Sequence, residues 1–140
     1  MGALRDRIGA PGVPIWATLF LLVVIGFGLF LGIPALLGSP MMDVHTIGWG
    51  GRQTGIGIAA VLALFSRNAL AYLMIFVIGI PREISDLLEA LDETPSNTAA
   101  AAQIGVTIVI GVLCASASAR AVRRGAGGFG ADAAADAAVA

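Results

Sequence analysis

Long apolar stretches alternate with short polar ones along the 140-residue chain, and the charged residues divide it into segments. No charge occurs in the 35 residues between Arg7 and Asp43, or in the 26 residues between Glu93 and Arg120. A helix needs about 20 residues to cross the ~30 Å hydrocarbon core of a bilayer. These two stretches therefore predict two transmembrane helices.

The middle of the chain is divided more tightly, by arginine. Arg52 and Arg67 are separated by 14 uncharged residues, and Arg67 and Arg82 by another 14. Both stretches are apolar, and the polar sequence Ser-Arg-Asn around Arg67 predicts a tight turn between them. This part of the chain therefore predicts a hairpin of two shorter helices.

Together these segments predict an all-α fold, an up-down bundle of four transmembrane helices in a single membrane domain, residues 1–124. The predicted helices cover residues 15–37, 48–66, 68–92 and 97–120. A kink is expected at Pro81, because proline removes a backbone hydrogen-bond donor. Residues 125–140 are rich in glycine and alanine without an apolar period, which predicts a disordered tail.

The composition agrees with a membrane location, since 58% of the residues are hydrophobic and only 12% are charged. The first apolar run, 23 residues long, exceeds the ~7 to 15 of a secretory signal sequence and predicts a retained helix. A formal net charge of −1 with scattered arginines offers no basic surface for nucleic acid. The lipid bilayer is therefore the expected partner, and nucleic acid is not.

The arginines also predict the orientation of the bundle. Because cytoplasmic loops are enriched in Lys and Arg, the side with more arginines is expected to face the cytoplasm. That side holds both termini, and the location is expected to be the plasma (inner) membrane. One side receives Arg5, Arg7, Arg67, Arg120, Arg123 and Arg124, whereas the other receives Arg52 and Arg82.

Arg52 and Arg82 are the starting point for a predicted site. Fifteen residues of helix rise about 22 Å from the turn at Arg67, at ~1.5 Å per residue. That is roughly 8 Å short of the far side of a ~30 Å hydrocarbon core. A charge at that depth is costly unless it is paired, hydrated or able to reach the interface.

Acidic neighbours supply partners, so the sequence predicts a cluster of polar side chains toward the outer leaflet. Its predicted members are Arg52, Arg82, Glu83 and Asp86, with Gln53 and Thr54 at its edge. In the alternative, the two helices are simply short and the arginines reach the surface along their flexible stems. Depth alone does not decide between these interpretations.

The residues after Pro81 show an amphipathic helical pattern. Its apolar stripe contains Ile80, Ile84, Leu87, Leu88 and Leu91, and its polar face contains Arg82, Asp86, Glu89 and Glu93. One interpretation is a docking helix, or a lid over the polar cluster. The other is a solvated face on a helix whose stripe covers its own bundle.

Small residues at four-residue spacing predict where the helices approach closely. They are Gly28 and Gly32 in the first helix, Gly51, Gly55, Ala59 and Ala63 in the second, and Gly111, Ala115 and Ala119 in the fourth. The same spacing serves packing inside a bundle and dimerisation.

Other candidate chemistry is sparse. The only histidine, His45, and the only cysteine, Cys114, do not by themselves provide a haem, zinc or dithiol site. Asp43 and His45 are interpreted either as a metal-binding or proton-relay pair or as surface residues of the loop. We therefore assign no catalytic residues, no metal ligands and no cofactor, and do not expect an enzyme.

The segment from Gly48 to Asp92 carries several short motifs. Gly-Gly-Arg is followed by Gly55 and Gly57, then by Leu-Phe-Ser-Arg-Asn, and acidic residues come soon after the next helix. In these features the chain resembles the DoxX-like group of small four-helix membrane proteins, over about a third of its length. The resemblance implies a four-helix accessory subunit, in some members attached to quinone-linked or thiol-linked redox enzymes.

Three functions are consistent with these features. The first is a non-catalytic integral membrane subunit or accessory protein that binds a membrane-protein partner or a second copy of itself. The second is a binder or carrier of a small lipophilic or anionic ligand, with Arg52 and Arg82 facing the anion. The third is a proton-coupled exporter similar to the small multidrug-resistance proteins, which fits least because the first helix contains no glutamate.

Overall fold

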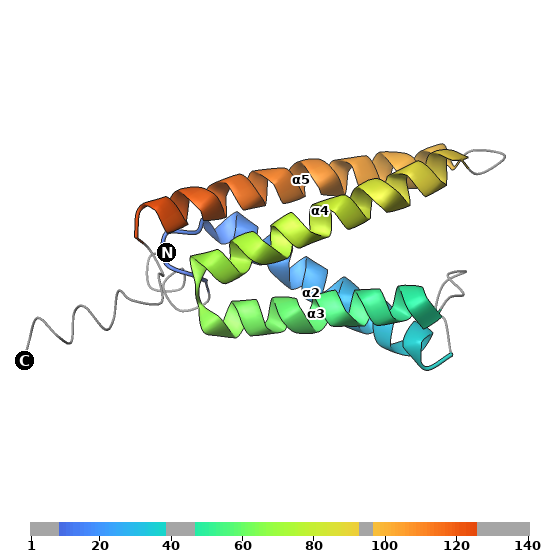
Figure 1. The fold of residues 1–140 in the computed structure, drawn as a ribbon, viewed down its shortest axis with the longest axis horizontal. Helices are drawn as coiled ribbons and strands as arrows, with labels where there is room; N and C mark the ends of the chain where they lie inside the picture. The colour runs from blue at the N-terminus through green and yellow to red at the C-terminus, as the bar shows by residue number, and fades with distance from the viewer. Residues whose placement is uncertain (1–8, 39–46, 93–96, 126–140) are drawn as a thin grey trace, which may run out of the picture.

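The structure is a computed structural model that describes residues 9–38, 47–92 and 97–125. Within these ranges it contains four α-helices and no strand, which confirms the predicted all-α chain with four helices. The helices are α2 (Ile15–Leu36), α3 (Ile47–Ser66), α4 (Ala69–Asp92) and α5 (Thr98–Arg123) (Figure 1). The last helix ends at Arg123 rather than at residue 120, and α4 runs through Pro81 as one helix. Residues 126–140 of the predicted tail lie outside the described residues.

Side chains and glycine account for several helix ends. The Asn97 side chain accepts a hydrogen bond from the backbone N–H of Ala100 at 3.1 Å, and thereby caps the start of α5. After α2, Gly38 has a φ of +77° and donates its N–H to the Ala35 carbonyl at 3.1 Å. Glycine adopts this left-handed conformation without a steric cost, so α2 ends there.

The turn between α3 and α4 consists of two residues. Arg67 has a φ of +50°, in the left-handed region, and reverses the chain direction. The Asn68 side chain then accepts the backbone N–H of Leu70 at 2.8 Å, while the Ser66 hydroxyl donates to the Ala63 carbonyl at 2.8 Å. These bonds satisfy backbone groups at the facing ends of the two helices.

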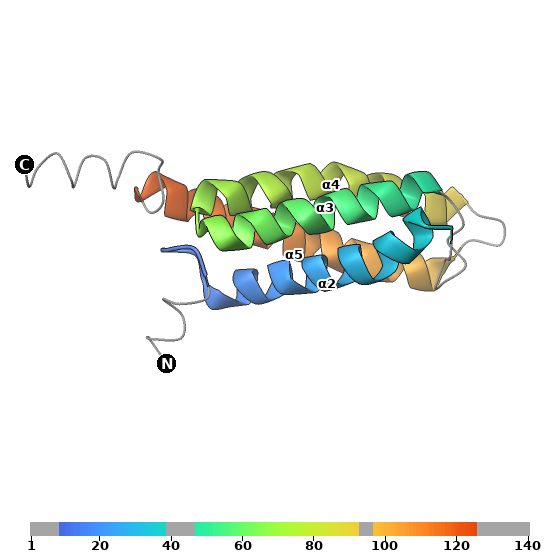
Figure 2. The same ribbon diagram turned by 90° about the horizontal axis from the view of Figure 1, so that it is seen from below.

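The four helices are arranged as two hairpins. Packing is closest between α2 and α3 and between α4 and α5, whereas the contact between α3 and α4 is smaller and that between α2 and α5 is smaller still. In Figure 1, α3 and α4 separate with increasing distance from their turn. Figure 2 shows α3 and α4 on one side of the bundle and α2 and α5 on the other. The two hairpins therefore meet mainly near the turn.

Glycine allows the close approach within the first hairpin. A Cβ added at Gly28 would lie 2.8 Å from the Gln53 carbonyl oxygen and 2.9 Å from the Gly57 Cα. A Cβ added at Gly32 would lie 2.6 Å from the Thr54 backbone nitrogen. All three distances are below van der Waals contact, so the α2 and α3 backbones can meet only because α2 lacks side chains here.

The predicted small-residue face of α3 is wrong at Gly51 and Gly55, whereas Ala63 of the same set is buried. A Cβ at Gly55 would meet nothing within 4 Å, and one at Gly51 would touch only the Leu36 side chain at 3.8 Å. The contact with α2 is made instead by the adjacent face, where Gly50 and Gly57 are buried. Small residues recur on two neighbouring faces of α3, so their spacing alone did not identify the packed one.

The apolar core lies toward the end of the bundle that holds the α3–α4 turn. Tyr72 and Leu21 are fully buried there. The rings of Phe20 and Phe76 stack with centroids 6.1 Å apart, and the Tyr72 ring packs edge-on against Phe76 at 6.4 Å. This core joins the two hairpins near the turn.

Among the described residues, α2 and α5 are long and apolar enough to cross a membrane, judged by length and composition. The most apolar stretch of each is only 22% buried. Both helices therefore turn most of their apolar side chains outward.

Candidate functional site

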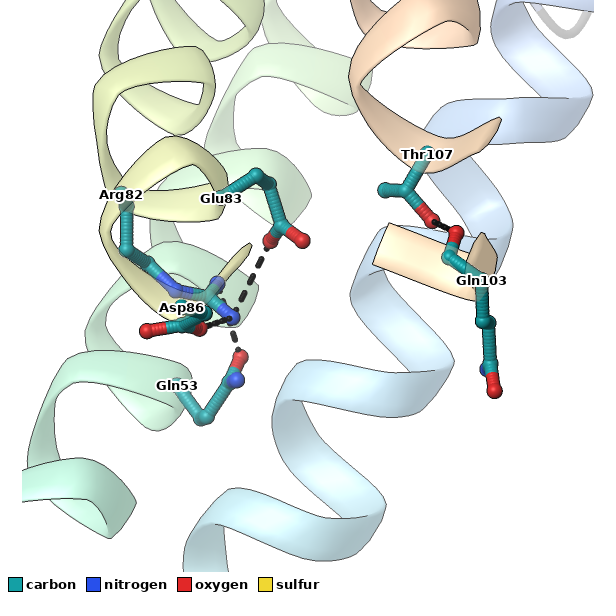
Figure 3. A network of polar contacts seen from close by, with 6 residues as sticks. All are labelled: Gln53, Arg82, Glu83, Asp86, Gln103 and Thr107. Carbon is teal, nitrogen blue, oxygen red and sulfur yellow. Dashed lines mark hydrogen bonds and ion pairs between the residues drawn. The ribbon is translucent and has the colours of Figure 1, made fainter. Parts of the chain in front are cut away.

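Arg82, the residue after Pro81 in α4, is the centre of a polar network (Figure 3). Its Nη2 lies 3.1 Å from Glu83 Oε1 and 3.2 Å from Asp86 Oδ2. Its Nη1 donates to Gln53 Oε1 at 3.1 Å. The side chains of the three charged residues are only 18 to 19% exposed. One largely enclosed guanidinium thus pairs with two carboxylates and donates a hydrogen bond to an amide.

The charged part of the network follows from positions along one helix. Asp86 comes four residues after Arg82, a spacing that places two side chains on the same helix face. Glu83 is the next residue along the chain, and its longer side chain bends back toward the Arg82 guanidinium (Figure 3). Local sequence is therefore enough to bring these three residues together.

Gln53 joins the network from α3, and therefore links the two hairpins. Its side chain is buried, with 5% of the residue exposed. The close approach of α2 holds its backbone, because Gly28 and Gly32 leave no space between the helices there. The amide oxygen is consequently held toward α4, where it accepts from Arg82.

Arg52, predicted as a member of the cluster, lies outside the network. It is exposed, and no hydrogen bond or ion pair of its side chain is found in the described part of the chain. Successive residues of an α-helix point about 100° apart, so Arg52 turns away when Gln53 faces the bundle interior. Their equal depth predicted that both arginines would join one cluster. In the structure, the Arg82 side chain faces its polar partners, whereas the Arg52 side chain points away from them.

Thr54 was also predicted at the edge of the cluster, and it too lies outside. It is buried against α2, with its Oγ1 2.8 Å from a Cβ added at Gly32. This hydroxyl has no hydrogen-bond partner within the described residues. Of the six predicted site residues, the structure therefore brings together Gln53, Arg82, Glu83 and Asp86.

Two hollows border the Arg82 network. An inner cavity of about 50 Å³ lies among all four helices, with Arg82, Glu83 and Thr107 in an otherwise apolar lining. The Thr107 hydroxyl donates to the Gln103 carbonyl at 3.1 Å, within α5 (Figure 3). The cavity is thus mostly apolar, with the Arg82–Glu83 ion pair in its wall.

The second hollow is an open groove of about 440 Å³ between α3 and α4. Its lining is formed by Gly51, Arg52, Gly55, Ile56, Ala59, Ile75, Ile78 and Arg82. The two predicted arginines therefore share a surface, although only one of them belongs to the ion-pair network.

The apolar stripe after Pro81 is only partly covered by the bundle. Leu87 is half-buried, whereas Ile84, Leu88 and Leu91 are 42%, 62% and 52% exposed. The interpretation in which the stripe covers its own bundle therefore holds at Ile80 and Leu87, and it is wrong at the three exposed positions. Apolar side chains are left on the surface of α4 beside the acidic residues.

The remaining candidates contribute no further site. Asp43 and His45 lie outside the described residues, and Cys114 is fully buried in the core. Within the ranges that the structure describes, no group of three or more His, Cys, Asp and Glu side chains could hold a metal ion.

Three buried hydroxyl groups were not predicted from the sequence. Thr18, Tyr72 and Ser118 are fully buried on three different helices. The Tyr72 hydroxyl faces the Thr18 side chain and the Ala10 backbone, whereas the Ser118 hydroxyl has no hydrogen-bond partner within the described residues. The one available signal was a lone tyrosine within the apolar run Ala-Leu-Ala-Tyr-Leu-Met. A single polar atom in such a run does not reveal which other helices it meets.

Comparison with known proteins adds no relative to this picture. No protein-family model, curated protein or solved structure matches the chain. The resemblance to the DoxX-like group therefore stays a hypothesis, and the site is interpreted from its own geometry.

Proposed function

We propose that the chain is a non-catalytic subunit or accessory protein of the plasma (inner) membrane, with four spanning helices and cytoplasmic termini. The shallow burial of α2 and α5 supports this proposal, since a core helix of a soluble protein would be mostly buried. Large apolar side chains are exposed on every helix, including Phe30, Phe65, Ile78 and Val109. Lipid would cover such a surface, which soluble monomers rarely carry.

The Arg82 network supports the proposal that α3 and α4 also span the membrane. A lone arginine in the hydrocarbon region is costly, whereas one paired with carboxylates and an amide is tolerated better. Arg82 has both kinds of partner, so α4 can carry it below the outer interface. Arg52 would reach the same interface with its flexible side chain.

The distribution of arginines along the bundle supports the proposed orientation. The start of α2, the α3–α4 turn and the end of α5 lie at one end of the bundle (Figure 1). Arg67, Arg120, Arg123 and Arg124 therefore gather at that end. A positive end of this kind favours the cytoplasmic side.

Cysteine labelling tests the membrane arrangement. We expect Ser66→Cys to react with a membrane-impermeant maleimide only after cells are permeabilised, and Thr98→Cys to react in intact cells. Both variants should carry Cys114→Ala, which removes the single native thiol. The same reactivity at both positions in intact cells would contradict the proposed topology.

The observation that carries the accessory role is the exposed apolar stripe of Ile84, Leu88 and Leu91. It lies on the part of α4 that the Arg82–Gln53 hydrogen bond ties to α3. An apolar surface that is fixed in position in this way, next to acidic side chains, can bind a membrane-protein partner or a second copy of the chain. The DoxX-like resemblance favours the same role.

Site-specific photocrosslinking tests this interface. A photoreactive phenylalanine analogue at Leu88 is expected to yield one discrete protein adduct in native membranes, with a mass that identifies a partner or a second copy. The same analogue at Val23, which is 59% exposed on α2, is the matched control and should yield lipid adducts only. Lipid adducts alone at both positions would refute the accessory role.

A second candidate function is favoured by a specific observation. Arg52 and Arg82 both line the groove between α3 and α4, whose other lining residues are apolar or glycine. This arrangement favours a binder of a small lipophilic anion.

A further inference from the structure

The groove between α3 and α4 has one charged end and a long apolar part. Because the two helices are antiparallel across the turn, Arg52 lies opposite Arg82 at one end, and Ala59 lies opposite Ile75 toward the other. Among the residues that the structure describes, none of those lining the groove is acidic. Its volume of about 440 Å³ falls within the range of ~300 to 1,000 Å³ that is typical of small-molecule sites.

The two arginines at the charged end differ in their partners among the described residues. Arg82 forms ion pairs with Glu83 and Asp86 through its Nη2, and these three side chains together carry a formal net charge of −1. Arg52 is exposed and makes no ion pair with any residue that the structure describes. The guanidinium that is available to an added carboxylate in the groove is therefore that of Arg52.

Glycine keeps the groove open. A Cβ at Gly55 would meet nothing within 4 Å, so the lack of a side chain at this position is not required by the packing of the helices. Ile56, Ile75 and Ile78 supply apolar walls around this space, and Ile78 is 57% exposed at its edge. The groove is thus accessible from the side that lipid would occupy.

We propose that the groove binds a single-chain lipophilic carboxylate, such as a fatty-acid anion, with its carboxylate at Arg52 and its chain along Gly55 and Ile75. The inference rests on the proposed membrane location. A guanidinium donates two parallel hydrogen bonds to a carboxylate, which gives both strength and orientation. By the helix rise from the turn at Arg67, the backbone at the groove end would lie roughly 8 Å below the far edge of a ~30 Å hydrocarbon core. A carboxylate held by the Arg52 guanidinium would then lie at or just below the interface, with its chain in the apolar phase.

Binding of radiolabelled palmitate to the full-length protein tests this proposal. The protein is placed in phosphatidylcholine nanodiscs, and empty nanodiscs supply the background for lipid partitioning. We expect saturable binding of one palmitate per chain. Arg52→Gln should weaken it at least tenfold, which corresponds to about 1.4 kcal/mol. Gly55→Leu, which fills the groove, should abolish it.

Two matched variants control for indirect effects. Gly26→Leu introduces the same side chain at an exposed helical glycine on α2, where a Cβ also meets nothing within 4 Å. Arg120→Gln removes an exposed arginine at the opposite end of the bundle. Both should bind palmitate as the wild type does, and all four variants should unfold within a few degrees of it.

Three results would overturn the proposal. They are wild-type affinity in Arg52→Gln, equally strong competition by the uncharged methyl ester of palmitate, and displacement of palmitate when phosphatidylglycerol replaces part of the phosphatidylcholine. The last would assign the groove to a phospholipid headgroup. Absence of palmitate binding in a protein that passes the cysteine-labelling test rejects the groove ligand alone, whereas failure of that test rejects the membrane arrangement as well.

Discussion

Replacing Arg82 with methionine is expected to destabilise the bundle far more than the same replacement at Arg52. The two arginines are related by the same distance from the turn at Arg67, and by depth alone they are equivalent. In the structure, Arg82 holds two carboxylates and the Gln53 amide, whereas Arg52 is exposed. Comparing the two variants therefore shows whether stability depends on the depth of an arginine or on the direction in which its side chain points.

The expected magnitude follows from the partners that Arg82 leaves behind. Methionine keeps much of the apolar stem but leaves Glu83 and Asp86 without a counter-charge and Gln53 without its donor. Removing one partner of a buried ion pair costs about 3 to 5 kcal/mol. Because these side chains keep 18 to 19% of their exposure, water can solvate the carboxylates in part, and we expect about 2 to 3 kcal/mol. An exposed substitution such as Arg52→Met should change stability by less than about 0.5 kcal/mol.

Unfolding of the detergent-purified full-length protein by sodium dodecyl sulfate, followed by tryptophan fluorescence, measures both effects. A double-mutant cycle with Gln53→Leu should give a coupling energy of about 1 kcal/mol for the hydrogen bond between the hairpins. Equal stability losses in Arg82→Met and Arg52→Met would refute the assignment of Arg82 as the internal partner. A coupling energy of zero would refute the link through Gln53.

Two further substitutions test the packing and the turn. Gly32→Ala places a methyl group 2.6 Å from the Thr54 backbone nitrogen and should destabilise the protein by about 1 to 3 kcal/mol in the same assay, whereas Gly26→Ala, in open space, should be neutral or stabilise by up to about 1 kcal/mol. The opposite order would disprove the α2–α3 contact. Asn68→Ala removes the side-chain oxygen that accepts the Leu70 N–H and should cost about 1 kcal/mol, and an unchanged denaturation midpoint would show that this cap is dispensable.

Local features of the molecule could be read from the chain alone. The spacing of charged residues predicted four helices, because a long apolar run between polar residues is typical of a helix. The turn at Arg67 and the pairing of Arg82 with Asp86 also depend only on residues close in sequence. For such features, helix geometry converts sequence spacing directly into position in space.

The direction in which each helix faces was decided by contacts between residues far apart in the chain. On α3, Gly51 and Gly55 are four residues apart and Gly50 and Gly57 are seven apart, and either spacing keeps two residues on one helix face. Only the approach of α2 through Gly28 selects the face of Gly50 and Gly57.

That selection turns Gln53 toward Arg82 and Arg52 toward the groove, which the sequence analysis had placed in one cluster. The sequence by itself therefore determined the helices, their turn and the acidic partners of Arg82, while the tertiary structure decided which polar side chains face the interior. The physical reason is that rotation of a helix about its axis changes no local hydrogen bond, so only packing against a neighbouring helix can choose it.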